Sequence, residues 1–354
     1  MVTGRATAAI TGIGTSMPGS ATQDELWEGY FAEHFGHRRA AKLAFGSAGV
    51  TTRHAAVNPL IEDVSMWSTG ARMERYLIEA MPIGKEALTG ALDAADLQPE
   101  QVGLFAVASC TGYATPGLDV RLARDIGMSP SLQRLSIGHV GCHAALPALG
   151  VLNDYVVAHT TPAVLLCLEL SSLHIQPPTS DLGQVVIHSL FSDAACAIIV
   201  EPTGASERPG LQVVDLIART DVGSIDDMTW NITDLGFRMT LSRHVSDAVA
   251  KETAPLVADL LRRNSMAVEE VDAWAIHPGG PRILDAVGDQ LHLGSEELSI
   301  SRHVLTDHGN CSSATILLVV EAVWRQLDPS PGRNVVALAF GPGLTLYAAL
   351  LRTT

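Results

Sequence analysis

One order of secondary-structure elements occurs twice along this chain: strand, helix, loop, helix, strand. The first copy starts at an expected strand over Val102–Ala108, and the second starts at one over Val271–His277. In each copy a turn led by glycine, at Gly141-Cys142 and at Gly309-Asn310, opens a helix of small residues. A repeated order of this kind predicts an internal duplication. If the halves pack with pseudo-two-fold symmetry, the two glycine-led turns meet at the centre.

The seam of the duplication is expected in the Pro/Gly-rich stretch 201–210, with an N-terminal half of residues 1–205 and a C-terminal half of residues 206–354. Short β-branched runs alternate with helix-period segments, which is typical of an α/β layered fold. The expected strands are Thr7–Ile13, Val102–Ala108, Ala163–Leu170, Ala194–Val200, Leu211–Thr220, Val271–His277, Val335–Phe340 and Thr345–Leu351. The expected helices are Gln23–Phe35, Ala71–Ala95, Leu118–Ile126, His143–Ala158, Leu241–Arg263, Pro281–Leu291 and Ser313–Gln326.

The composition narrows the class of protein. Apolar residues make up 47% of the chain and charged residues 17%, which excludes a disordered chain. The net charge of -15 argues against nucleic acid as a partner, because that binding depends on clustered Lys and Arg. No apolar run approaches the ~18 residues that a membrane span requires, and the five cysteines form no C-x-x-C pair. We therefore expect a cytoplasmic protein without a signal peptide.

Cys142 is the candidate nucleophile. It follows Gly141, which permits a sharp turn, and it precedes a helix that opens without side-chain bulk. The backbone N–H groups and the positive dipole end at the start of a helix favour a thiolate. A lone Cys before an Ala-rich helix is more often a buried small hydrophobe. That interpretation is accepted for Cys167 and Cys196, which lie in strand-like runs.

Two further residues complete a candidate site. His277 ends an expected strand and is followed by Pro278-Gly279-Gly280-Pro281, which would hold the imidazole in a rigid turn. Taken alone, this His is a loop residue and Asn310 is a helix N-cap. Together with Cys142 they can perform thioester chemistry. The thiolate attacks an acyl thioester, the imidazole maintains the thiolate as an ion pair, and the imidazole and amide N–H groups stabilise charge on the thioester oxygen.

Four segments follow one another in a recognisable order: Gly141-Cys142, Ile276-His277-Pro278-Gly279-Gly280-Pro281, Gly309-Asn310-Cys311-Ser312-Ser313-Ala314-Thr315 and Phe340-Gly341-Pro342-Gly343-Leu344. They resemble the type III polyketide synthases of bacterial type, the chalcone synthase-like family of the thiolase superfamily. The matches cover the chain from about residue 70 to its end. The resemblance implies a thiolase-like five-layered αβαβα fold, a homodimer, and Cys142, His277 and Asn310 as catalytic residues. It also implies a tunnel for CoA thioesters that leads to a buried Cys.

The resemblance implies roles for other residues. Phe191 matches the family's gatekeeper between tunnel and cavity, and Met239 falls near the second gatekeeper, where Phe is usual. Thr115 matches the residue that reaches across the dimer into the partner's cavity. The further cavity-lining matches are Cys110, His174 and Ser312. The basic residues Arg38, Arg39 and Lys42 fall roughly where the family contacts the phosphates of CoA.

The chain also departs from the family. The usual G-C-x-A-G-G and F-G-D-G-A-A read Gly141-Cys-His-Ala-Ala-Leu and Phe191-Ser-Asp-Ala-Ala-Cys here, so bulkier residues replace glycines and change the expected cavity shape. His139 and His143 flank the nucleophile at i, i+4, but no carboxylate or second Cys completes a tetrahedron. We expect no metal and no redox cofactor.

Three other functions remain open. A papain-like hydrolase uses the same residue types in the order Cys, His, Asn, but its C-G-S-C-W-type signature is missing and the nucleophile lies 141 residues into the chain. An enzyme like β-ketoacyl carrier-protein synthase III would share the fold and the three residues, and would prefer a carrier-protein donor. A non-catalytic acyl-binding protein would release no CO₂ from malonyl-CoA.

The favoured hypothesis is a decarboxylating acyltransferase. Cys142 takes an acyl group from a starter CoA thioester, and malonyl-CoA or methylmalonyl-CoA then loses CO₂. The resulting enolate, held by His277 and Asn310, attacks the Cys142 thioester and lengthens the chain. The cycle repeats until the product cyclises, with an alkylpyrone or a resorcinol expected.

Overall fold

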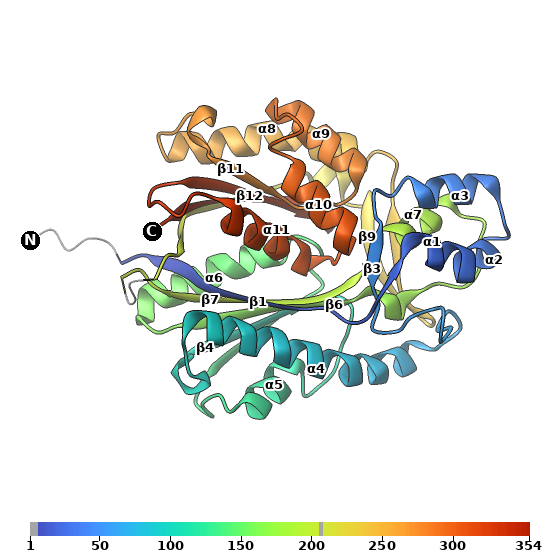
Figure 1. The fold of residues 1–354 in the computed structure, drawn as a ribbon, viewed down its shortest axis with the longest axis horizontal. Helices are drawn as coiled ribbons and strands as arrows, with labels where there is room; N and C mark the ends of the chain where they lie inside the picture. Colours follow the sequence, from blue (N-terminus) through green and yellow to red (C-terminus); the bar gives the residue numbers. More distant parts are fainter. Residues whose placement is uncertain (1–5, 205–207) are drawn as a thin grey trace, which may run out of the picture.

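The computed structural model describes residues 6–204 and 208–354, which form five stacked layers (Figure 1). The helices of these layers are α4 (Thr69–Ala95), α5 (Leu118–Ile126), α6 (Ala145–His159), α8 (Val245–Arg263), α9 (Pro281–Leu291) and α11 (Ser313–Gln326). Helices α4 and α5 cover one outer face, α8 and α9 cover the other, and α6 and α11 lie between the two layers of strands. The expected αβαβα arrangement is confirmed.

Among the described residues, nine strands form one continuous sheet in the order β11-β12-β13-β8-β1-β7-β6-β4-β5. Their bounds are β1 Ala8–Ser16, β4 Leu104–Ser109, β5 Gln133–Gly138, β6 Ala163–Leu170, β7 Asp193–Pro202, β8 Leu211–Thr220, β11 Ala273–Ile276, β12 Asn334–Gly341 and β13 Thr345–Thr353. Strands β1 and β8 pair at two positions, Ala9 with Gln212 and Ile10 with Leu211. The two arms of the sheet diverge from this short join and face each other across α6 and α11.

The two arms repeat one topology, which confirms the internal duplication. In the first arm β4 runs parallel to β6, β6 antiparallel to β7, and β7 antiparallel to β1. In the second arm β11, β12, β13 and β8 repeat these orientations in the same order. Strand β5 pairs with β4 in the first arm, whereas the second arm has helix α10 (Ser299–His308) at this point of the chain. The boundary expected between residues 205 and 206 lies outside the described residues.

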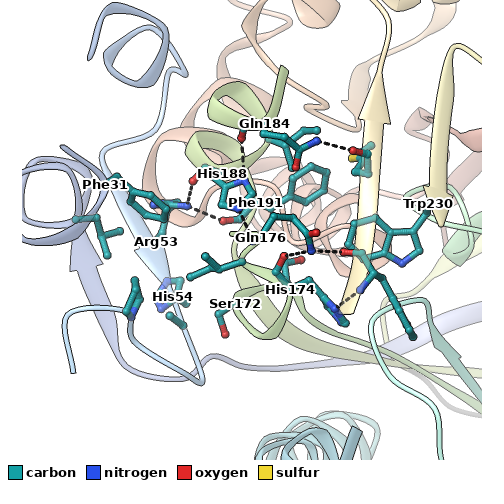
Figure 2. Close-up of a pocket in the computed structure, with 18 residues that line it drawn as sticks. Phe31, Arg53, His54, Ser172, His174, Gln176, Gln184, His188, Phe191 and Trp230 are labelled. Atoms are coloured by element: carbon teal, nitrogen blue, oxygen red, sulfur yellow. Dashed lines mark hydrogen bonds between the residues drawn. The ribbon is translucent and has the colours of Figure 1, made fainter. Parts of the chain in front are cut away.

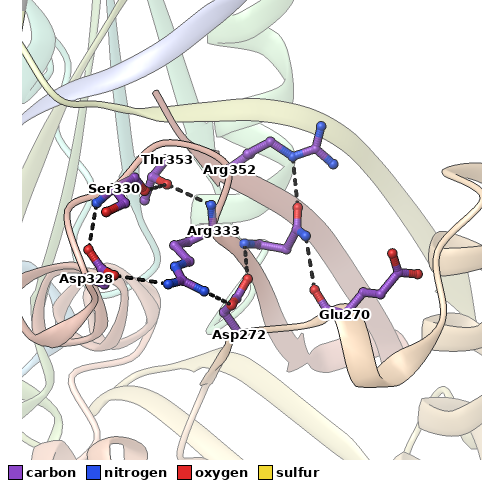
Figure 3. Close-up of polar contacts among 8 residues, drawn as sticks. Glu270, Asp272, Asp328, Ser330, Arg333, Arg352 and Thr353 are labelled. Carbon is purple, nitrogen blue, oxygen red and sulfur yellow. Dashed lines mark hydrogen bonds and ion pairs between the residues drawn. The ribbon is translucent and has the colours of Figure 1, made fainter.

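Small side chains allow the middle layer to fit between the two arms. Ala145 and Ala148 on α6 and Ala314 on α11 are 0% exposed, and they pack against the inner faces of both arms. At the edge where β11 and β12 begin, the side chains are polar and contact one another (Figure 3). There Arg333 pairs with Asp272 and with Asp328, at 3.0 Å in each case. The candidate site lies at the other end of these strands.

Several expected elements match the structure residue for residue, namely Ala163–Leu170, Leu211–Thr220, Leu118–Ile126, Pro281–Leu291 and Ser313–Gln326. The expected helix Gln23–Phe35 is helical over α1 (Gln23–Leu26), a π-helical turn (Trp27–Phe31) and α2 (Ala32–His34). The sequence pattern did not indicate α3 (Arg39–Gly46), α7 (Leu182–Leu190), α10, β2 (Ser20–Thr22), β3 (Thr52–His54), β5, β9 (Met228–Thr233) or β10 (Gly236–Leu241). No helix in the described part of the chain combines the length and apolar character that crossing a membrane requires.

Candidate active site

Cys142 lies in a tight turn between β5 and α6. The helix begins at Ala145, two residues later than expected, because the chain first forms a turn in which the Ala144 N–H donates to the Gly141 carbonyl at 3.0 Å. Gly141 has a φ of 87°, and a Cβ at this position would lie 2.6 Å from Pro342 Cδ. Glycine is therefore required for the turn to pack against Pro342 and to present the thiol. Cys142 is buried, with 7% exposure.

His277 follows the last residue of β11, and its backbone N–H donates to the Leu338 carbonyl on β12 at 2.8 Å. The imidazole is 1% exposed and packs edge-on against Phe340, with 5.5 Å between ring centroids. Neither ring nitrogen has a hydrogen-bond partner among the described residues. An unpaired buried polar group destabilises a fold by about 1–3 kcal/mol. His277 is therefore a candidate for binding a ligand through its ring nitrogens.

Asn310 precedes α11, and the oxygen and the nitrogen of its side-chain amide have different roles. Its Oδ1 accepts the Ser312 N–H at 2.9 Å and the Thr315 hydroxyl at 3.4 Å, so this oxygen caps the helix. Its Nδ2 group donates to no described residue. The backbone is held on both sides, because the Asn310 N–H donates to the Leu190 carbonyl and the Asn310 carbonyl accepts from the Ser192 N–H. The amide nitrogen is thus held in place and free to bind a ligand oxygen.

The three segments meet at one place in the fold. Gly341, at the end of β12, abuts the nucleophile, because a Cβ on Gly341 would lie 3.3 Å from the Cys142 nitrogen. His277 ends the neighbouring strand β11, which runs parallel to β12. Ser312, two residues after Asn310, lines the same cavity as Cys142. Tertiary packing therefore brings the three segments together, although the inner cavity is lined by Cys142 and not by His277 or Asn310.

Burial controls the charge of the site. It raises the pKa of Cys142 to about 12, with the nearby Glu169 adding to the rise and the Ser312 hydroxyl opposing it. Burial also lowers the pKa of His277 to about 3, and His143 acts in the same direction. Each group by itself therefore favours its neutral form. A proton passed from Cys142 to His277 would create two opposite charges in a poorly solvated space, where their mutual attraction is strong.

Cys142 opens onto an inner cavity with about 340 Å³ of empty space, part of it open to solvent. The lining residues are Cys110, Thr111, Gly141, Cys142, Ser171, Phe191, Trp230, Met239, Ser312 and Pro342. Four of the expected cavity residues, Cys110, Phe191, Met239 and Ser312, thus lie around the nucleophile. Ser312 has a φ of 50°, an uncommon conformation for a residue other than glycine. This backbone conformation is held at the cavity wall, where strained residues frequently serve function.

An outer cavity adjoins the inner one, because Phe191, Trp230, Met239 and Ser171 line both. It contains about 600 Å³ of empty space, part of it open to solvent. Figure 2 shows Trp230 on one side of it and Phe31 on the other. Phe191 is one of the side chains that line both spaces, as a gatekeeper would.

His174 forms part of the wall of the outer cavity, as expected. Its Nε2 donates to the Thr111 carbonyl at 2.7 Å, and its Nδ1 accepts the Phe237 N–H at 2.9 Å. Burial lowers the pKa of His174 to about 3, and the ring stacks on the Phe237 side chain at 4.6 Å between centroids. Because both ring nitrogens form hydrogen bonds within the protein, His174 is a neutral residue that connects two backbone segments and is not available as a general acid.

Trp230 and Glu169 are among the site residues that the sequence analysis missed. Trp230 lines both cavities, and its Nε1 donates to the Cys110 carbonyl at 2.7 Å. Glu169 is 0% exposed and accepts from the Cys110 N–H at 3.0 Å, the Thr111 hydroxyl at 2.8 Å and the Ser313 hydroxyl at 2.6 Å. Burial raises the pKa of Glu169. A single acidic residue inside the apolar strand Ala163–Leu170 was the available signal for it.

The remaining expected residues lie outside the two cavities. Thr115 is exposed and lines a surface hollow together with Tyr113. Arg38 uses its guanidinium within the protein, donating to the carbonyls of Phe35, Thr179 and Ser180 at 2.9 to 3.0 Å. Arg39 and Lys42 are exposed on α3. Of the expected basic patch, these two side chains are the ones available to a phosphate.

The histidines on either side of the nucleophile pack against aromatic rings. His143 is 5% exposed and stacks on Tyr347, with ring centroids 5.6 Å apart. His139 packs near Phe237, with 6.4 Å between centroids. Across residues 6–204 and 208–354, no group of three or more His, Cys, Asp or Glu side chains is arranged to hold a metal ion.

Comparisons with known proteins agree with this geometry. The family model described as the N-terminal domain of chalcone and stilbene synthases matches residues 2–204, and the C-terminal domain model matches residues 216–354. The alpha-pyrone synthesis polyketide synthase-like Pks18 of Mycobacterium tuberculosis is 31% identical over 360 residues, which covers 97% of this chain and 90% of that protein. The 1,3,6,8-tetrahydroxynaphthalene synthase of Streptomyces peucetius subsp. caesius is 35% identical over 311 residues, covering 86% and 81%. The crystal structure of PKS-I from the brown alga Ectocarpus siliculosus is similar over 100% of both chains, with a TM-score of 0.93 and 26% identity.

Proposed function

The chain belongs to the chalcone and stilbene synthase family, whose members are acyl-condensing type III polyketide synthases with a thiolase-like fold, and we propose that it extends an acyl starter with malonyl units on Cys142. The observation that supports this most is a pair of polar groups without described partners, the His277 imidazole and Asn310 Nδ2, on segments that adjoin the turn and cavity of the buried Cys142. Such groups are matched to a ligand oxygen on which negative charge develops. A papain-like hydrolase is not compatible with this family.

The first proposed step loads the enzyme. Cys142 passes its proton to His277, and the thiolate attacks the carbonyl carbon of a starter CoA thioester. The bond from that carbon to the CoA sulfur breaks, and CoA leaves with the proton. The product is an acyl thioester on Cys142 at the wall of the inner cavity.

The second proposed step forms the new carbon–carbon bond. Malonyl-CoA, or methylmalonyl-CoA, loses CO₂, and the electron pair of the broken bond becomes an enolate. Its oxygen accepts hydrogen bonds from His277 and from Asn310 Nδ2. The enolate carbon then attacks the Cys142 thioester, and the thiolate is released. The acyl chain is now two carbons longer on CoA and can be loaded again.

Partners and product follow from the same proposal. CoA phosphates would bind near the exposed Arg39 and Lys42, and a homodimer would place the exposed Thr115 at the partner's cavity. A cyclised alkylpyrone or resorcinol is the proposed product, and the relative with alpha-pyrone synthesis in its name supports the former. No cofactor is required by these steps. We also propose a cytoplasmic location, because all five cysteines are free.

Removing the free amide of Asn310 tests the second step. Asn310→Asp keeps an oxygen that caps α11 but loses the N–H donor, so decarboxylation of malonyl-CoA should slow by about 10²-fold. Acylation of Cys142 by a starter CoA should change little, because it precedes the enolate. Release of labelled CO₂ measures the first quantity, and intact-protein mass spectrometry measures the second. Unchanged decarboxylation would show that Asn310 only caps the helix.

His277→Ala tests the first step through its pH dependence. Burial raises the pKa of Cys142 to about 12, and the proposed ion pair with His277 opposes that rise. Without the imidazole, the midpoint pH for alkylation of Cys142 by iodoacetamide should move upward by at least about one unit. His159→Ala, at the exposed far end of α6, is the matched control and should leave the midpoint in place. An unshifted midpoint in His277→Ala would remove the ion pair from the mechanism.

A further inference from the structure

Arg53 is a buried arginine with an unusual environment. It is 7% exposed, and its guanidinium forms no ion pair with any described residue. The guanidinium carbon lies 5.5 Å from the Phe31 ring centroid and 5.4 Å from that of Phe45. Burial lowers the pKa of Arg53 to about 9, and Asp193 opposes this shift. A buried cation is costly to the fold, and the contacts of the guanidinium compensate for this cost.

The guanidinium binds the end of helix α7. Its Nη1 donates to the His188 carbonyl at 2.5 Å and to the Phe191 carbonyl at 3.1 Å (Figure 2). Helix α7 ends at Leu190, and the last carbonyls of a helix lack partners within it. A cation at this end also complements the helix dipole. Arg53 therefore fixes where α7 stops and how the chain leaves it.

The segment that Arg53 holds also holds Asn310. The Leu190 carbonyl accepts the Asn310 N–H at 2.8 Å, and the Ser192 N–H donates to the Asn310 carbonyl at 2.9 Å. Arg53 touches the other side of the same junction, because a Cβ on Gly309 would lie 3.4 Å from Arg53 Cγ. One side chain thus contacts both segments whose backbones meet at Asn310.

From these contacts we propose that Arg53 is a positioning residue for Asn310, an inference that rests on the proposed function. It fixes the carbonyl end of α7, which fixes the backbone of Asn310 and hence the direction of Nδ2. The Asn310 Oδ1 is already anchored on Ser312 and Thr315, so small movements of the backbone turn the amide nitrogen. Loss of Arg53 should impair the step that uses this nitrogen and spare the loading of Cys142.

Other contacts keep the segment folded without Arg53. The Gln23 Nε2 donates to the Ser189 carbonyl at 2.8 Å, and the His54 N–H donates to the Ser192 hydroxyl at 2.7 Å. The Asp193 carboxylate accepts the Ala56 N–H at 2.8 Å. A variant at position 53 is therefore expected to fold with a displaced Asn310, which makes the proposal testable in the intact protein.

The experiment measures two half-reactions in the full chain. Decarboxylation of malonyl-CoA reports on Asn310, and single-turnover acylation of Cys142 by a starter CoA reports on loading. In Arg53→Met the ratio of decarboxylation to acylation should fall by about 10-fold, since displacements below 1 Å have effects of this order. Arg53→Lys keeps the charge and donors but loses the planar fork, so its ratio should fall by about threefold.

The matched control is Arg333→Met, which removes an arginine held by polar contacts at the far edge of the sheet (Figure 3). Its ratio should equal that of the unaltered protein. If Arg53→Met has the same ratio of decarboxylation to acylation as the unaltered protein, the proposal is overturned. If Arg53→Met does not fold, the same result in Arg53→Lys overturns it. Asn310→Asp distinguishes failure of this proposal from failure of the proposed function. If the proposed function is wrong, Asn310→Asp decarboxylates malonyl-CoA at the native rate, whatever the result for the Arg53 variants.

Discussion

Cys142→Ala is expected to lower polyketide formation by roughly 10³-fold or more, because removal of a covalent nucleophile leaves no acceptor for the starter. The thiol is buried at the wall of the inner cavity, where the alanine methyl group fits without rearrangement. Incubation with an acyl-CoA should give no mass increase on the intact variant. Incubation with labelled malonyl-CoA should give no extended product.

The matched control for this substitution is Cys196→Ala. Cys196 is a 0% exposed cysteine on β7 that packs in the core between the two arms of the sheet. Its loss should lower the free energy of unfolding by about 1 kcal/mol and leave acyl loading intact. Elongation at the native rate by Cys142→Ala would refute the assignment of the nucleophile.

The largest effect on stability is expected at Arg72, a 0% exposed residue on α4. Its Nε donates to the Trp67 carbonyl at 2.9 Å and its Nη2 donates to the Ser65 carbonyl at 3.0 Å. Its Nη1 donates to the carbonyls of Leu173 and Ile175, at 2.5 and 3.0 Å. Burial lowers the pKa of Arg72 to about 10, so the group remains charged at neutral pH. One guanidinium thus satisfies four carbonyl groups in two segments, residues 65–67 before α4 and residues 173–175.

Arg72→Met fills a similar volume and leaves all four carbonyl groups without a donor. At about 1 kcal/mol for each unpaired group, the free energy of unfolding should fall by about 4 kcal/mol. Urea denaturation followed by circular dichroism measures the change. Arg333→Met, whose ion pairs are partly exposed, should lose only about 1 kcal/mol. A loss at Arg72 no larger than this control would show that the carbonyl groups find other partners.

The local sequence pattern was sufficient to predict an element where burial produces a continuous run of apolar residues. Strand β6 was predicted to the residue, because every position of Ala163–Leu170 is buried and no polar residue except Glu169 interrupts it. Helix α7 was missed for a related reason. Its polar residues Gln184, His188 and Ser189 are buried, whereas Leu182 is exposed, so polarity along the segment does not indicate which face is buried.

The residues of the candidate site also fall into those that local sequence reveals and those that only the fold reveals. Cys142, His277 and Asn310 were identified because each lies next to glycine residues in a turn that local sequence reveals. Arg53 and Trp230 were not, because their roles depend on contacts with carbonyl groups more than 100 positions away in the chain. Arg38 shows the converse: a basic cluster indicated a phosphate site, whereas the fold directs this guanidinium to the carbonyls of Thr179 and Ser180.

The amino-acid sequence alone determined the order of the main strands and helices, their duplication and the three turns that carry chemical groups. These are consequences of short-range sterics and of burial periodicity, which neighbouring residues specify. Only the tertiary structure decided which nitrogens remain unpaired, how the two cavities join and which arginine holds Asn310. Those properties arise from packing and desolvation between distant segments, and no local stretch of sequence encodes them.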